Sequence, residues 1–213
     1  MTRKGFSRLS IPWFQALSLF LLQVSVACAD GAGEDRDWDK PWSIVAYSGM
    51  YTPRTFGETV FRFPGDLEKN YIHAFGLNRR LFRWPKHFTW EGEFLFAVHH
   101  GRNETGRQRY EEYAACLLLR YHRFPWDRYL NTTVAFGEGL SYTSALSLRE
   151  AQAASGETRK LLNYLAVELG FALPRYPDWS LVYRIHHRSG VFGLMGGLAG
   201  VSDYYCLGIR YRF

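Results

Sequence analysis

The sequence predicts an all-β fold: an eight-stranded antiparallel transmembrane β-barrel of the outer membrane. Three observations lead to this fold class. Eight segments alternate apolar and polar residues, aromatic residues make up 17% of the chain, and an alternating segment ends the chain at Phe213. A strand sends successive side chains to opposite faces, so alternation predicts a sheet with two unlike faces. An even number of such segments is typical of bacterial outer-membrane barrels.

The N-terminal segment has the order of a secretory signal peptide. Basic residues come first, an apolar stretch follows, and Ala27-Cys28-Ala29 supplies the small residues that a signal peptidase reads. We therefore predict a signal peptide over residues 1–29 and a flexible periplasmic lead-in over 30–41. Lipid attachment at Cys28 is the alternative. The predicted route is Sec-type export to the outer membrane of a Gram-negative cell.

The predicted barrel domain spans residues 42–213. Its strands are expected near Trp42–Thr52, Tyr71–Arg83, Phe88–His100, Gln108–His122, Thr132–Ser144, Lys160–Leu173, Asp178–Ser189 and Asp203–Phe213. The third is the clearest, with Phe94 and Phe96 on one face and Glu91 and Glu93 on the other. The first lacks clean alternation, and the fifth sets Glu138 among apolar neighbours.

Charged residues of both signs are expected inside the barrel, where they can form pairs in a narrow lumen. The inward set is Glu91, Glu93, Glu112, Glu168, Arg120, Arg184, Arg210 and Arg212. Short Pro-containing connections at 84–87, 124–131 and 174–177 alternate with mostly longer ones at 53–70, 101–107, 145–159 and 190–202. Such alternation predicts periplasmic turns and outer loops. A short helix fits only within 147–162.

Composition limits the alternatives. The formal charge is +6, but the basic residues are scattered among aromatic ones, which does not indicate a nucleic-acid partner. After the signal, no apolar stretch is long enough for a transmembrane helix. A soluble barrel with its apolar face inside is the alternative fold. Cys116 and Cys206 lie on different strands, with no ground for a disulfide between them.

The last two strands carry the candidate catalytic residues. His187 and Ser189 share the apolar face of one strand, and Asp203 begins the next. Antiparallel pairing should bring Asp203 near both, at the outer end and facing lipid. A Ser hydroxyl becomes a nucleophile when a neighbouring His takes its proton, and a carboxylate can hold that imidazole in place. Backbone N–H groups near Gly190 are a candidate oxyanion hole.

The stretch His186-His187-Arg188-Ser189-Gly190, followed by a Gly-rich loop and an acidic residue, resembles the lipid A 3-O-deacylase family of the PagL type. The resemblance covers about the last 35 residues in detail and the rest in architecture only. It implies an outer-membrane barrel that hydrolyses the ester-linked acyl chain at the 3-position of lipid A. It also implies catalytic roles for His187 and Ser189. The family acid corresponds to Asp203, although the family has Glu there.

The predicted function is therefore an outer-membrane serine esterase acting on lipid A of lipopolysaccharide, with no cofactor. Two alternatives remain: a non-catalytic barrel that stabilises the envelope or binds a partner, and a barrel lipase or acyltransferase acting on another lipid. His186 should point into the lumen. His99 and His100 lack carboxylate or Cys partners at metal-ligand spacing, so no metal site is expected. Whether the barrel forms a homodimer stays open.

Overall fold

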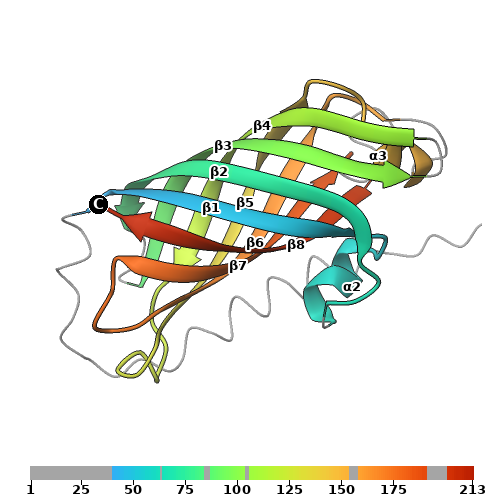
Figure 1. The fold of residues 1–213 in the computed structure, drawn as a ribbon. Coiled ribbons are helices and arrows are strands. Elements are labelled where there is room, and N and C mark those ends of the chain that lie inside the picture. Colours follow the sequence, from blue (N-terminus) through green and yellow to red (C-terminus); the bar gives the residue numbers. More distant parts are fainter. Residues whose placement is uncertain (1–39, 63, 84–86, 104–105, 154–157, 191–200) are drawn as a thin grey trace, which may run out of the picture. The chain divides into compact units, whose positions relative to one another are not determined.

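The computed structural model describes residues 40–62, 64–83, 87–103, 106–153, 158–190 and 201–213 (Figure 1). The predicted signal peptide and residues 30–39 of the lead-in lie outside the described residues. The strands are β1 (Trp42–Thr52), β2 (Glu68–Arg83), β3 (Phe88–Asn103), β4 (Gly106–Tyr121), β5 (Asn131–Thr143), β6 (Leu161–Ala172), β7 (Trp179–Ser189) and β8 (Val201–Arg212). Two short helices, α2 (Phe56–Phe61) and α3 (Leu148–Ala153), lie in connections.

The eight strands form one closed antiparallel barrel, as predicted. Each strand pairs with its neighbours in sequence, and β1 also pairs with β8. At the seam the Trp42 N–H donates to the Phe213 carbonyl at 3.2 Å, and the Phe213 N–H donates to the Trp42 carbonyl at 2.9 Å. Closure leaves no strand edge with unpaired backbone groups, which a lipid environment requires.

Three of the sequence expectations about elements are wrong. A short helix was expected only within 147–162, but α2 forms at Phe56–Phe61 as well. β1 does alternate, with the side chains of Val45 and Tyr47 buried and those of Ala46 and Ser48 exposed. Its alternation is hard to see in the sequence because the outward Ala46 and Ser48 are small while the inward Val45 and Tyr47 are large. The segment 101–107 is not a longer loop, because the pairing of β3 with β4 continues as far as Asn103 opposite Gly106.

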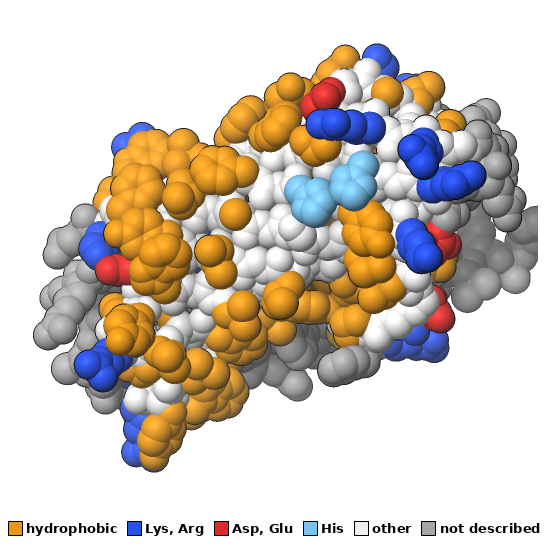
Figure 2. All heavy atoms as spheres, in the orientation of Figure 1, with side chains coloured by type: hydrophobic (Ala, Val, Ile, Leu, Met, Phe, Trp, Pro, Cys, Tyr) orange, Lys and Arg blue, Asp and Glu red, His pale blue; other side chains and the backbone are white. Residues whose placement is uncertain are grey.

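Apolar side chains cover the outside of the barrel wall (Figure 2). Half or more of the side-chain surface is exposed at Phe75, Phe94, Leu117, Leu140, Leu181, Leu207 and Ile209. Aromatic pairs such as Trp179 with Tyr211, with ring centroids 4.7 Å apart, flank this apolar band. An apolar outer face excludes the soluble-barrel alternative, in which the apolar side chains line the interior. Of the two described helices, neither is long and apolar enough to cross a membrane.

The lumen near the chain ends is filled by buried ion pairs. Arg184 contacts Glu93 at 2.6 Å and Glu168 at 2.5 Å, and Arg120 contacts Glu91 at 3.0 Å and Glu168 at 2.7 Å. Arg210 adds a third contact to Glu168 at 2.9 Å. Six of the eight residues of the predicted inward set, all but Glu112 and Arg212, therefore form one network. Opposite charges held this closely offset the cost of removing each from water.

A second polar network fills the other half of the lumen. Glu112 accepts from Ser141 at 2.6 Å and lies 2.6 Å from His99 Nε2 and 3.1 Å from His186 Nε2. Nearby, Arg188 contacts Glu150 of α3 at 2.5 Å. The inward position predicted for His186 is confirmed.

The two ends of the barrel differ in their connections. Both chain ends of the barrel lie at the end that carries the connections 84–87, 122–130 and 173–178 (Figure 1). The opposite end carries α2, α3 and the paired ends of β3 and β4 at Asn103 and Gly106. Short turns face the periplasm in outer-membrane barrels, so we assign the opposite end to the cell exterior.

Candidate active site

The β7–β8 ladder brings two of the three predicted catalytic residues together. His187 lies directly opposite Asp203 in the antiparallel register. The Nδ1 atom of His187 is 2.7 Å from Oδ1 of Asp203, and both side chains are buried. An ionised carboxylate can only accept hydrogen bonds, so Nδ1 of His187 carries a proton and donates a hydrogen bond to Asp203. The Nε2 atom of His187 is then the ring's acceptor, which is the tautomer that a general base needs.

The histidine and aspartate do not face lipid, and that expectation is corrected. His187 is only 4% exposed and Asp203 only 1%, although both point to the outer side of the wall. The covering element is α2, which lies in the β1–β2 connection and packs on β7 and β8 (Figure 1). The ring of Phe56 lies over the imidazole of His187, with centroids 4.3 Å apart.

A capping arrangement starts α2 at this place. Glu58 accepts hydrogen bonds from the backbone N–H of Thr55 at 3.3 Å and from its hydroxyl at 3.0 Å. These two bonds hold the pKa of Glu58 below its ordinary value, and the bond from the Thr55 hydroxyl has the larger effect. The positive charge of Arg62 lowers this pKa further. The helix therefore begins where Phe56 can reach His187. The spacing Thr55-Phe56-Gly57-Glu58 is the signal in the sequence that could have predicted it.

Ser189 lies two residues beyond His187 at the end of β7. Its side chain is half-buried, and among the described residues its hydroxyl has no hydrogen-bond partner. Gly190, the candidate oxyanion donor, follows it and is buried. The structure thus sets Ser189 on the same side of the strand as His187 without a bond between them. Hydrogen bonds of catalytic groups are often long before substrate binds.

Two further features surround the pair. The second oxygen of Asp203, Oδ2, is buried and has no hydrogen-bond partner within the part of the chain that is described. Below the pair, the outer wall of β7 and β8 is apolar, with Leu181 50%, Leu207 58% and Ile209 53% exposed. A polar pair at the head of an apolar wall is suited to an amphiphilic molecule lying along the barrel.

A second histidine cluster lies inside the barrel, and it corrects the expectation that His99 lacks a carboxylate partner. His99, Glu112 and His186 offer ligand atoms within 4.8 Å of one another, which is a geometry that a metal ion could use. Three of the four ring nitrogens already have partners: Tyr47 lies 2.9 Å from His186 Nδ1, and both Nε2 atoms lie within hydrogen-bond distance of Glu112. The fourth, Nδ1 of His99, is buried and has no hydrogen-bond partner among the described residues. Residue spacing could not show the cluster, because barrel closure brings β3, β4 and β7 together.

Comparison with known proteins gives the fold. No family model and no curated protein matches the chain. Among solved structures, the outer membrane enzyme PagL matches with a TM-score of 0.55 and 12% identity over 80% of this chain and 99% of that one. Neisserial surface protein A gives 0.48 with 11% identity, covering 81% and 97%. OprG from Pseudomonas aeruginosa gives 0.42 with 15% identity, covering 82% and 96%. The chain is an outer-membrane β-barrel of Gram-negative type, embedded in the membrane.

Proposed function

We propose that this barrel is an outer-membrane esterase that removes the 3-O-linked acyl chain from lipid A. The observation that carries the proposal is the buried hydrogen bond between His187 and Asp203, with Ser189 two residues further along the same face. Nothing in the packing of a lipid-facing wall requires a buried carboxylate, which is costly to remove from water. The PagL-type residue pattern supplies the substrate class.

The proposed chemistry uses three groups in sequence. The Nε2 atom of His187 takes the proton of the Ser189 hydroxyl as its oxygen attacks the acyl carbonyl carbon. The tetrahedral intermediate collapses, the sugar 3-oxygen leaves with the proton from His187, and an acyl-enzyme ester remains on Ser189. Water, deprotonated by His187, then attacks this ester; the acyl–oxygen bond to Ser189 breaks, His187 returns the proton to the Ser189 oxygen, and the fatty acid is released. Asp203 holds the ring and stabilises its charged form throughout.

The surroundings fit an acyl ester. The exposed side chains of Leu181, Leu207 and Ile209 give acyl chains a wall to lie on below the catalytic pair. Phe56 covers the imidazole, so substrate entry requires a shift of α2 away from His187. Exclusion of water by such a cover strengthens the electrostatic interactions beneath it.

A non-catalytic barrel is the second candidate, and one observation favours it. The pair is almost fully covered and Ser189 makes no hydrogen bond to His187, an arrangement that would also serve only to fasten α2 to the barrel wall. In that case the barrel would act through its outer surface and not through chemistry.

Mass spectrometry of lipid A from cells that produce the protein tests the proposal. Wild-type protein should remove one 3-hydroxyacyl chain from the lipid. Ser189→Ala should abolish this loss, while Ser180→Ala, on the same strand near its periplasmic end, should leave it unchanged. Both variants should reach the membrane as folded barrels, because neither hydroxyl makes a hydrogen bond among the described residues. Unmodified lipid A with wild-type protein would favour the non-catalytic barrel. Loss of a different acyl chain would favour a lipase of another specificity.

A further inference from the structure

A basic hollow lies on the outer wall of β2, β3 and β4, away from the catalytic pair. Its volume is about 550 Å³, and its lining comes from Lys69, His100, Gly101, Arg102, Arg107, Gln108 and Arg109. Four of these are cations with exposed side chains that point away from the lumen. Figure 2 shows basic side chains gathered at this end of the barrel, beyond the apolar band. None of the lining residues lies on β7 or β8.

The register of the hairpin sets like charges against each other. Arg102 lies directly opposite Arg107, and His100 lies directly opposite Arg109. Like charges in opposed positions of an antiparallel pair destabilise it. Within the described residues, Lys69, Arg102, Arg107 and Arg109 form no ion pair, and the nearest outward-facing acid on these strands is Glu111, next along β4 toward the membrane. The described residues of the lining therefore carry an excess of positive charge that an anion would relieve.

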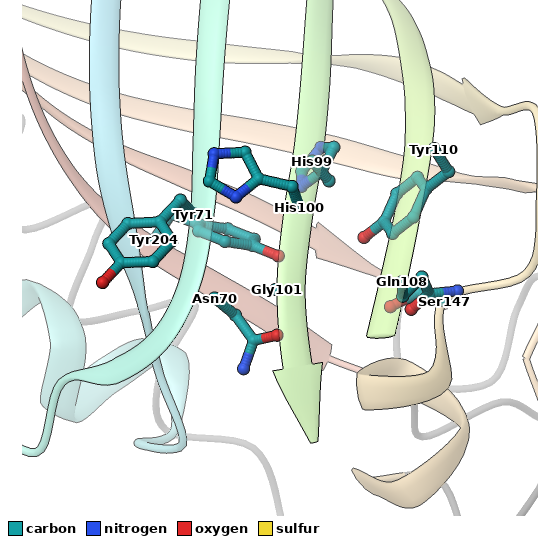
Figure 3. Close-up of a pocket in the computed structure, with 9 residues that line it drawn as sticks. All are labelled: Asn70, Tyr71, His99, His100, Gly101, Gln108, Tyr110, Ser147 and Tyr204. Atoms are coloured by element: carbon teal, nitrogen blue, oxygen red, sulfur yellow. The ribbon is translucent and has the colours of Figure 1, made fainter. Parts of the chain in front are cut away.

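Side-chain contacts hold His100, one of the residues that line the hollow, in place. The Nε2 atoms of His73 and His100 are 2.9 Å apart, and the hydroxyl of Ser48 is 2.8 Å from Nδ1 of His73. The ring of Tyr71 lies 5.2 Å from that of His100, centroid to centroid. Figure 3 shows Tyr71 and His100 side by side at the ends of β2 and β3. These contacts restrict the His100 ring, which lines the hollow together with the four cations.

The position of the hollow along the barrel axis indicates which kind of anion it binds. The cations stand at the exterior end, and apolar side chains follow on the same outward face toward the periplasm, with Phe96 38%, Phe75 51% and Phe94 56% exposed. A ligand that fills both parts has anionic groups at the head and acyl chains below. Guanidinium groups match phosphate oxygens in two-pronged hydrogen bonds.

We propose that this hollow binds the phosphate groups of a lipopolysaccharide molecule of the outer leaflet, as a site separate from the β7–β8 pair. Arg102, Arg107 and Arg109 contact the phosphates, Lys69 and His100 complete the positive lining, and the acyl chains lie along β2 to β4. The proposal does not depend on esterase activity, because it needs only the outward cations and the membrane position of the barrel.

Native mass spectrometry of the detergent-solubilised barrel tests the site. The probe is lipid A with two phosphates, titrated against wild type, Arg102→Gln/Arg107→Gln/Arg109→Gln and a matched control, Arg79→Gln/Arg128→Gln/Arg175→Gln. The control removes the same charge from exposed positions near the periplasmic end. If the barrel removes an acyl chain from the probe, both phosphates remain on the lipid, so the measured binding still reports on the phosphate site. We expect the dissociation constant of one bound lipid to rise about tenfold or more in the first variant and to stay within about twofold in the control.

Two further arms identify the source of the anion. Lipid A lacking one phosphate should bind wild type more weakly than lipid A with two phosphates. The two triple variants should then bind this lipid with the same dissociation constant. Inorganic phosphate at the same concentration should not displace the lipid. Equal lipid binding by both triple variants, or displacement by inorganic phosphate at that concentration, would overturn the proposal. Without lipid, the Arg102→Gln/Arg107→Gln/Arg109→Gln barrel should be at least as stable to urea as wild type, since opposed charges are removed.

Discussion

Two side-chain contacts hold the imidazole ring of His187 in place. Its Nδ1 atom is fixed by Asp203 at 2.7 Å, and its ring is covered by Phe56 at 4.3 Å between centroids. The hydrogen bond sets the tautomer and the ring contact restricts rotation of the side chain. With Nδ1 occupied by Asp203, Nε2 is the remaining polar atom of the ring. That atom is the one the proposed chemistry needs.

Asp203→Asn tests the tautomer directly. The amide NH₂ can donate to Nδ1 of His187, which moves the ring proton to Nε2 and removes the acceptor for the Ser189 proton. We expect kcat for fatty-acid release from lipid A in detergent to fall by about 10³ to 10⁴, the loss typical of this change in a catalytic triad. Asp203→Glu is the matched control, because it keeps the carboxylate, and it should retain more activity than Asp203→Asn. Equal activity of Asp203→Asn and wild type would show that Asp203 does not orient the base.

The helix α2 shows what a loop can add to a strand pair. Residues facing outward on β7 and β8 near the exterior would be exposed on a bare barrel, yet Ile185, His187 and Asp203 are each buried to 4% exposure or less. The cover comes from a helix of six residues in the β1–β2 connection. A short helix is only marginally stable alone, so its packing on the wall and its capping residues hold it.

Phe56→Ala should expose His187. Removing the ring takes away its contact with the imidazole, so carbethoxylation of His187 by diethylpyrocarbonate, followed by peptide mass spectrometry, should become severalfold faster. Phe61→Ala on the same helix is the control, since Phe61 is already 79% exposed and covers nothing of comparable area. If both variants react like wild type, the helix does not limit access to the pair. The exposed His100 provides an internal standard for the reaction.

Most elements were predictable from the sequence, and the exceptions have physical causes. Strand alternation reports which face is buried, so β7 and β8 and the opposed positions of His187 and Asp203 follow from counting residues. The β3–β4 hairpin was missed because arginines at its tip resemble a polar loop. The contact of His99 with Glu112 was partly predictable from the sequence, since both residues face inward on the neighbouring strands β3 and β4. His186 lies on β7 and reaches them only because the barrel closes. The contact of Phe56 with His187 depends on how a loop folds back, which alternation does not report.

At the scale of the whole molecule, the barrel has an apolar outside and a charged inside. Glu91, Glu93 and Glu168 lie among Arg120, Arg184 and Arg210 in the periplasmic half of the lumen, all buried. In this closed barrel the interior is too narrow for a water-filled channel, so side chains must fill it and satisfy one another. The ion pairs therefore serve packing and stability, and the groups open to ligands are on the outer wall.

Arg184→Leu tests how much this network contributes to stability. The change removes the arginine at 2.6 Å from Glu93, which leaves that buried carboxylate without an ion-pair partner among the described residues, and it removes one of the three arginines that contact Glu168. We expect the free energy of unfolding in lipid vesicles, measured by urea titration with the heat-dependent gel shift as readout, to fall by about 3–5 kcal/mol. Arg184→Leu/Glu93→Leu removes both charges of one pair and should recover part of the loss. Arg175→Leu, an exposed position in the β6–β7 connection, should change it by less than about 0.5 kcal/mol. An Arg184→Leu barrel as stable as the Arg175→Leu control would mean that lumen packing, and not charge pairing, holds the barrel together.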